Sequence, residues 1–239
     1  MRIAAIVLLG ALLAHAEGSR VEMTFHVDRD TAKEIDSDEK AQKAAEDDTP
    51  VILRRLQAAD IKGVQVAQMK WQVRVTLENA DADTAERVKR LVSTVGRLEI
   101  FIDTENQEEL DKDIPGSRVL ARRDAGEEPA RLRVKVPAVL GSDSVATASA
   151  SQTPEGWAIL VKLAEKGKSS FADVTKQSVG KRLAIALDGE LWSAPTIREA
   201  IVDGTARVSG SFTEFQARDL SAILDSGPLP APLKLVSEK

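Results

Sequence analysis

The order of strand and helix patterns in the first hundred residues constrains the fold of this chain more than any other feature. Residues 20–27 alternate polar and apolar side chains with a period of two, which predicts a strand. The segments that follow are a helix from Thr49 that ends before Gly63, strands at 64–68 and 72–77, a helix that ends at Gly96 and a strand at 98–102. This order predicts that residues 17–103 form a ferredoxin-like (βαββαβ) base, an α+β fold with helices on one face of an antiparallel sheet.

The start of the first helix is marked by Thr49-Pro50, an N-cap residue followed by proline at the first helical position. The preceding residues 28–48 are polar and mostly charged. Their acidic cluster does not match a calcium loop, because it contains no D-x-[DN]-x-[DN]-G pattern with a distal glutamate. We therefore expect residues 28–48 to be a solvated helix or loop.

A second α+β unit is expected at residues 117–210. The acidic stretch 104–116, which contains Pro115-Gly116, predicts a connection before it and a candidate hinge. Within the unit, residues 142–153 are rich in Ser, Ala and Thr, a composition that fits either a linker or a strand, and the alternation favours the strand. The run at 183–187, interrupted by Asp188-Gly189, predicts a hairpin with a two-residue turn.

The C-terminal stretch 211–239 is expected to hold a helix and then a strand that returns to the base. Thr213 is the predicted N-cap of the helix, and Gln216, three residues later, completes a capping box. Gly227-Pro228 ends the helix.

The first sixteen residues have the layout of a secretory signal peptide. Met1-Arg2 is a short basic region, an apolar run follows, and Ala14-His15-Ala16 is a small-x-small cleavage site. We therefore expect a periplasmic protein that begins at Glu17 and has no membrane span after cleavage. The alternative is an uncleaved segment that anchors the protein in the inner membrane.

Composition and motifs argue against several function classes. The net charge of −5, with both signs mixed along the chain, gives no basic footprint for nucleic acid. The chain has no cysteine and two histidines, of which His15 lies in the signal peptide, so we expect no disulfide, metal site or cofactor. His26 alone cannot supply a Cys-His pair, and the sequence contains no G-x-S-x-G or phosphate-loop motif. We expect no catalytic residues, although the sequence leaves paired carboxylates open.

From Thr49 to Leu233 the chain resembles the large periplasmic domain of the SecD family. The resemblance rests on the order and spacing of five runs: TPVILRRLQAADIKGVQVAQMKWQVRVTLENA, LEIF, KGKSSFADVTKQSVGKRLAIALDGELWSAP, SGSFTEFQARDL and LDSGPLPAPL. SecD is the membrane subunit that works with SecF beside the bacterial protein-export channel. The resemblance implies a ferredoxin-like base and a head subdomain, here residues 117–210. In the family, the head swings relative to the base and holds preproteins that emerge from the channel, in late export driven by the proton gradient.

Two departures from the family pattern change what the resemblance implies. The chain reaches Lys239 a few residues after Pro230, where a SecD would enter its transmembrane bundle. It also lacks the Gly-Gly motif expected before the first base strand. We therefore expect a SecD-like periplasmic domain without the transmembrane bundle and without a proton-driven motor of its own.

Five apolar residues in or directly after the second unit are the candidates for partner binding: Leu191, Trp192, Pro195, Ile197 and Phe212. Exposed apolar residues near a hairpin end would suit extended polypeptide, bound in pockets or by strand addition, whereas buried ones would be core. We expect a non-enzymatic accessory of protein translocation that binds unfolded or translocating polypeptide, the Sec channel, or SecD and SecF. The alternatives are an envelope binding module for a glycan or a lipoprotein partner, and a hydrolase with a carboxylate site.

Overall fold

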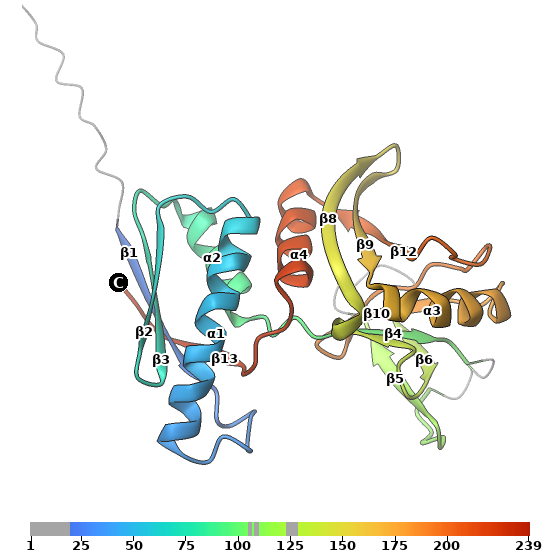
Figure 1. Ribbon diagram of the computed structural model, residues 1–239, viewed down its shortest axis with the longest axis horizontal. Helices are drawn as coiled ribbons and strands as arrows, with labels where there is room; N and C mark the ends of the chain where they lie inside the picture. The colour runs from blue at the N-terminus through green and yellow to red at the C-terminus, as the bar shows by residue number, and fades with distance from the viewer. Residues whose placement is uncertain (1–19, 105–106, 108–109, 123–128) are drawn as a thin grey trace, which may run out of the picture.

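The computed structural model describes residues 20–104, 107, 110–122 and 129–239. The predicted signal peptide, residues 1–16, lies outside this range. Figure 1 shows two parts, one at each end of the longest axis, with the helix α4 between them. Within the described residues, no helix combines the length and apolar character needed to cross a bilayer.

The first part, which we call the base, is a four-stranded antiparallel sheet with two helices on one face (Figure 1). Its elements are β1 (Val21–Val27), α1 (Asp38–Ala58), β2 (Val64–Met69), β3 (Gln72–Leu77), α2 (Ala82–Ser93) and β13 (Leu233–Glu238), with sheet order β13-β1-β3-β2. Alternate residues such as Met23, Phe25, Val73 and Val75 are fully buried, as the period of two predicts. The expected ferredoxin-like α+β base is therefore confirmed.

The fourth strand of the base is a different segment from the one the sequence predicts. Residues 98–102 do form a strand, β4 (Leu98–Ile102), but it pairs with β10 (Leu183–Leu187) and β7 (Leu140–Gly141). β13 occupies the place beside β1 instead. The pattern predicts a strand but not its partner, and here both Ile100 and Phe101, on opposite faces of β4, are buried, as in the middle of a sheet covered on both sides. Assigning residues 98–103 to the base was therefore wrong.

Helix α1 begins twelve residues earlier than predicted, since its N-cap is Ser37 and not Thr49. Ser37 is its N-cap and accepts a hydrogen bond from the Lys40 amide, and Pro50 lies inside the helix. An interior proline costs about 3 kcal/mol, but one buried stripe runs along α1 on both sides of Pro50 and offsets that cost by packing. The stripe contains Ala41, Ala45, Asp48, Val51, Ile52, Arg55 and Leu56.

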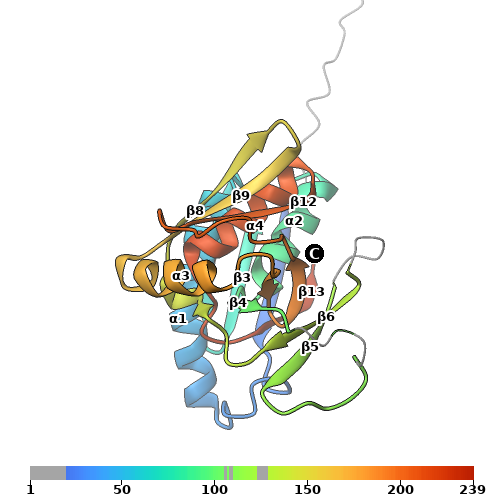
Figure 2. The same cartoon turned by 90° about the vertical axis from the view of Figure 1, so that its right-hand side faces the viewer.

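The second part, which we call the head, contains three small sheets and one long helix (Figure 2). The β4-β10 sheet also includes β11 (Glu190–Ser193), the second sheet is β12-β9-β8, and the third is β5-β6. The remaining bounds are β5 (Ser117–Ala121), β6 (Arg131–Lys135), β8 (Val145–Thr153), β9 (Gly156–Leu163), α3 (Glu165–Gln177) and β12 (Thr205–Phe212). The predicted hairpin is confirmed: Asp188 and Gly189 have φ of 52° and 84° and join β10 to β11.

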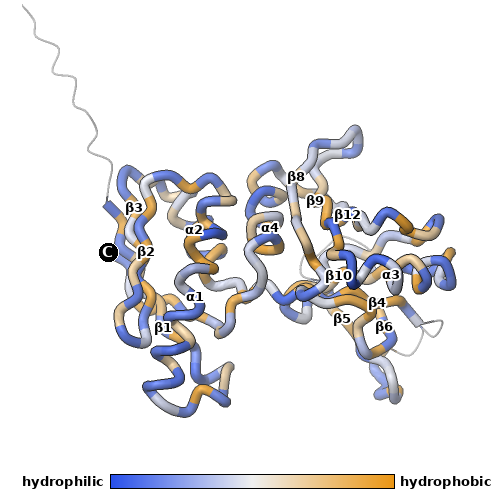
Figure 3. Tube along the Cα trace, in the orientation of Figure 1, coloured by the Kyte–Doolittle hydropathy of each residue, from blue (hydrophilic) through white to orange (hydrophobic). Residues whose placement is uncertain are grey.

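Helix α4 (Glu214–Ser226) connects the two parts. It contacts α1 and α2 of the base and β8, β9 and β12 of the head, so residues on most of its circumference are buried. The predicted capping box is confirmed, because the Thr213 hydroxyl accepts from the Gln216 amide while the Gln216 side chain accepts from the Thr213 amide. Figure 3 shows apolar residues in both parts and in α4. One hydrophobic core runs from the base through α4 into the head.

Candidate functional site between base and head

A groove of about 990 Å³ lies between the base and the head. One wall is α2 of the base, and the other is formed by β11, the end of β12 and the first turns of α4. We call it the base–head groove. Its apolar lining residues are Leu91, Leu191, Trp192, Phe212, Phe215, Leu220 and Ile223.

Two aromatic rings form the head side of the groove. Trp192 on β11 and Phe212 at the end of β12 stack with ring centroids 6.4 Å apart and planes 25° apart. The two strands are tied together by the Ser193 hydroxyl, which donates to the Ser209 carbonyl. Gly210 makes room for the Phe212 ring, because a Cβ at that position would lie 3.1 Å from a ring carbon. Offset aromatic pairs of this kind present a broad apolar surface at a fixed angle.

A third ring, that of Phe215, is the most exposed aromatic side chain of the groove. It sits in the first turn of α4 with 61% of its surface exposed. The guanidinium carbon of Arg87, on α2, lies 4.8 Å from the centre of the ring, within cation–π range. Arg87 therefore holds the orientation of an aromatic ring that the core does not cover.

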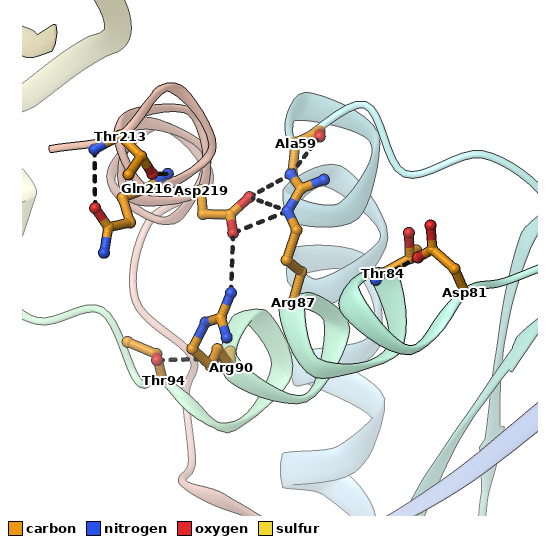
Figure 4. Close-up of polar contacts among 9 residues, drawn as sticks. All are labelled: Ala59, Asp81, Thr84, Arg87, Arg90, Thr94, Thr213, Gln216 and Asp219. Atoms are coloured by element: carbon orange, nitrogen blue, oxygen red, sulfur yellow. Dashed lines mark hydrogen bonds and ion pairs between the residues drawn. The ribbon is translucent and has the colours of Figure 1, made fainter.

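An ion pair links the two walls of the groove (Figure 4). Arg87 Nε donates to both carboxylate oxygens of Asp219 at 3.1 Å, and Arg87 Nη2 donates to Asp219 Oδ1 at 2.5 Å and to the Ala59 carbonyl at 3.1 Å. Arg90 lies 3.9 Å from the same carboxylate. Both partners of the main pair are largely buried, with 14% and 11% of the Arg87 and Asp219 side chains exposed. The pair is bidentate and partly desolvated, which makes it stronger than a surface ion pair.

Two further polar groups of the groove, Arg122 and Asp81, are committed to the fold. Arg122 donates to the Trp192 carbonyl at 2.9 Å and so braces the strand that carries that ring. Asp81 caps α2 by accepting from the Thr84 amide at 2.7 Å, and the Thr84 hydrogen bonds hold the pKa of Asp81 below its usual value.

The structure separates the five predicted binding residues into two groups. Leu191, Trp192 and Phe212 line the base–head groove. Leu191 is fully buried in a small core beneath β10 and β11, so it contributes mainly to packing. Ile197 is buried in the main core, and half-buried Pro195 lies away from the groove, where its carbonyl accepts from the Leu183 amide. Of the five predicted residues, only Trp192 and Phe212 therefore remain candidates for contact with a partner in the groove.

Sequence reasoning missed Phe215, Arg87 and Asp219. A signal for Phe215 existed: it is apolar but lies outside the Ala217, Leu220 and Leu224 spacing that marks one buried side of α4. The Arg87–Asp219 pair had no local signal, because its members are far apart in the sequence.

The lining of the groove is chemically suited to binding. Among its described residues there is neither histidine nor cysteine, and His26 packs edge-on against Trp71 in the base. Among the described residues, no group of three His, Cys, Asp or Glu side chains is close enough to hold a metal ion. What the groove offers is apolar and aromatic surface with fixed charges at its edge.

Comparison with known families gives a match in the second half of the chain. The family model described as "SecDF, P1 head subdomain" matches residues 117–231. Among curated proteins, the protein translocase subunit SecD of Rickettsia bellii is 33% identical over 178 residues, which cover 73% of this chain and 34% of that protein. The SecD of Desulfurispirillum indicum is 35% identical over 187 residues, 72% of this chain and 36% of that protein. The chain therefore spans about a third of the length of these relatives.

Solved structures of SecDF also align with most of this chain. A crystal structure of SecDF in a super-membrane-facing form aligns with a TM-score of 0.68 and 25% identity, over 92% of this chain and 30% of that one. A second structure, described as a membrane component SecDF that enhances protein export, aligns with a TM-score of 0.63 and 26% identity, over 90% of this chain and 98% of that one. Base and head are thus both present in these neighbours.

Proposed function

Since this chain is a relative of SecD and its residues 117–231 match the SecDF P1 head subdomain, we propose that it acts in protein export by holding extended polypeptide in the base–head groove. The solved neighbour that aligns over nearly its whole length is described as enhancing protein export. The proposal gives this chain a binding role on the periplasmic side of the membrane, with no catalytic step and no proton-driven step in the described residues.

The observation that carries the proposal is the concentration of aromatic rings in the groove. The chain has only eight aromatic residues, three Trp and five Phe, and three of them line this one groove. Trp192, Phe212 and Phe215 come from a strand, a strand end and a helix, so the fold brings them together. Broad apolar rings can take varied apolar side chains, which suits a site that must accept many polypeptide sequences.

Three charged residues of the groove, Arg87, Asp219 and Arg122, also favour a peptide over a small polar ligand. Arg87 and Asp219 satisfy each other, and Arg122 donates to a main-chain carbonyl of the wall. A site for a specific polar ligand would instead point unsatisfied donors and acceptors into the pocket. The groove therefore supports recognition by apolar contact with weak sequence preference.

A binding measurement with matched variants tests the proposal. We expect Phe215→Ser to weaken binding of a fluorescein-labelled peptide with alternating Leu and Phe, measured by anisotropy, by about tenfold, since burying a Phe side chain is worth about 1.5–3 kcal/mol. Val202→Ser is the control, because it removes an apolar side chain that is 74% exposed and lies outside the groove. Equal affinity of the two variants for the peptide would contradict the proposal.

Trp192→Ala gives a second test of the same site. If Trp192 serves binding, the variant loses affinity for the peptide and unfolds at nearly the same temperature as the wild type. A stability loss of about 3–5 kcal/mol, typical of truncating a core Trp, would show that Trp192 serves packing instead.

Crosslinking in intact cells identifies the natural occupant. A photo-crosslinkable amino acid at position 215 is expected to capture translocating polypeptide or subunits of the export channel. Capture of only glycans or unrelated lipoproteins would favour the alternative, an envelope binding module of the same fold.

A further inference from the structure

The chain crosses between base and head twice, and the two crossings lie side by side. The first runs from Thr94 to Arg97, and the second is the segment 227–232, which we call the return segment because it leads from α4 back to β13. The Leu229 amide donates to the Val95 carbonyl at 2.7 Å, which joins the two crossings. The two covalent connections between base and head therefore run side by side (Figure 1).

The return segment has few amide donors with which to hold its position. Its sequence, Gly-Pro-Leu-Pro-Ala-Pro, leaves only three amide N–H groups, because proline has none. The Gly227 amide donates to the Leu224 carbonyl and the Leu229 amide to Val95. The third, that of Ala231, donates to Oδ1 of Asp48 on α1 at 3.1 Å. At the base end of the segment, the Asp48 carboxyl acts beside one main-chain hydrogen bond, in which the Asp28 amide donates to the Pro232 carbonyl at 2.8 Å.

Asp48 is an unusual residue for this position. Its side chain is 0% exposed, and its Oδ2 has no hydrogen-bond partner among the described residues. A buried carboxylate that accepts only one hydrogen bond is costly, whereas a protonated carboxyl group at the same place loses its charge and most of that cost. The geometry therefore favours the protonated form when the return segment is in place.

We propose that Asp48 is a proton-responsive lock on the junction: its protonated form holds the return segment against α1, and its deprotonated form loosens that segment. The proposal is independent of what the base–head groove binds. It concerns the link between base and head.

The charges around Asp48 are few and belong to α1. Burial raises the pKa of Asp48 to about 7, although the hydrogen bond from the Ala231 amide and the charge of Arg55 both act to lower it; the charge of Asp47 raises it. β1 and β3 turn apolar residues towards α1, and the return segment carries no titratable group. Helices α2 and α4 meet the C-terminal end of α1, where Arg87 donates to the Ala59 carbonyl and pairs with Asp219.

The direction of the pH effect follows from linkage. When the return segment opens, Asp48 meets water and its pKa falls towards the ordinary value of 3.8. The open form is then favoured increasingly as the pH rises from about 4 to about 7, by up to about tenfold per pH unit, and the effect levels off above about pH 7.

Amide exchange measured by NMR on the full chain tests the lock. After correction for intrinsic exchange rates, protection of the Ala231 amide is expected to fall by about tenfold or more between about pH 5 and about pH 7 in the wild type. Asp48→Asn, which cannot ionise, is expected to show no such fall. Asp47→Asn is the matched control, since it removes one charge from the neighbouring, more exposed position and is expected to behave as the wild type.

A titration of the carboxyl carbons in the wild type keeps the test independent of any variant. The Asp48 signal is expected to titrate near neutral pH. Titration near 4, or identical pH profiles of Ala231 protection in the wild type and Asp48→Asn, would overturn the proposal.

Discussion

Arg87 on α2 and Asp219 on α4 form a forked ion pair that spans the groove between base and head. Three of its hydrogen bonds are 3.1 Å or shorter, and both side chains are largely shielded from water. The same guanidinium lies over the ring of Phe215. One arginine therefore fixes the position of α4 relative to α2 and the orientation of the most exposed aromatic ring of the groove.

Breaking this pair from one side is expected to be costly. Asp219→Asn and Arg87→Gln should each lower the free energy of unfolding by about 3 kcal/mol, because each leaves a largely buried charge without its partner. In a double-mutant cycle, denaturant unfolding should give a coupling energy of about 1.5–3 kcal/mol. The exposed pair Arg218–Glu214 is the control, with an expected coupling below about 0.5 kcal/mol. Equal coupling for the two pairs would contradict this account.

Arg55 is expected to be the most sensitive cation of the junction. It is 0% exposed and donates to the carbonyls of Leu91, Thr94, Val95 and Gly227 and to the Ser226 hydroxyl. Arg55→Lys keeps the charge but has only three donors, so we expect a loss of about 3 kcal/mol or more in urea unfolding. Arg54→Lys, one residue earlier and exposed, should change stability by less than about 0.5 kcal/mol. A small effect of Arg55→Lys would show that these hydrogen bonds contribute little.

The raised pKa of Asp48 predicts how the stability of the protein depends on pH. The pKa of Asp48 is raised to about 7 in the folded state, whereas it is about 4 in the unfolded state. The contribution of Asp48 to the free energy of unfolding is therefore largest below about pH 4 and is lost as the pH rises to about 7. The loss is at most about 4 kcal/mol. Carboxyls with lowered pKa values, such as Asp28 and Asp81, act in the opposite direction, since they stabilise above about pH 4 and lose this effect in acid.

The difference in the free energy of unfolding between the wild type and Asp48→Asn separates the contribution of Asp48 from that of the other carboxyl groups. Thermal unfolding at several pH values should show that the stability of the wild type, relative to that of Asp48→Asn, falls as the pH rises from about 4 to about 7. Parallel curves across this range would mean that Asp48 titrates alike in the folded and unfolded states.

The N-cap of α4 is expected to contribute about 1 kcal/mol. Thr213→Ala removes the oxygen that accepts from the Gln216 amide. Substitutions of this kind at an N-cap lower the free energy of unfolding by about 0.5–2 kcal/mol. Thr213→Ser keeps that oxygen and should stay within about 0.5 kcal/mol of the wild type. Similar losses for the two variants, measured by chemical denaturation, would point to the lost Thr methyl group and not to the cap.

Local features could be predicted because their signals lie close together in the sequence. The Asp188-Gly189 turn and the Thr213–Gln216 capping box each depend on residues within a few positions of one another, and the structure confirms both. The strand at residues 98–102 was also recognised, but not its partners. Pairing is decided by long-range packing, and nothing within β4 distinguishes a place beside β1 from a place beside β10.

The charged residues of α1 show why the junction could not be predicted. Asp48 and Arg55 have the composition of a solvated helix face, and the acidic run before Thr49 strengthens that impression. Both are buried because α2, α4 and the return segment supply hydrogen-bond partners from distant parts of the chain. Likewise, the groove depends on Arg87 and Phe215 coming together from different elements.

The pairing of β1 with β13 has a consequence for the order in which the protein folds. Met23 pairs with Glu238, so the whole head lies between these two strands in the chain. The head is contiguous from β4 to β12 and can form its contacts early, whereas the base sheet must wait for a very long-range closure, which slows folding. Until β13 arrives, β1 is an open sheet edge that can pair with a strand of another molecule. A nascent or truncated chain that stops short of β13 is therefore expected to aggregate through β1, even when its head is already folded.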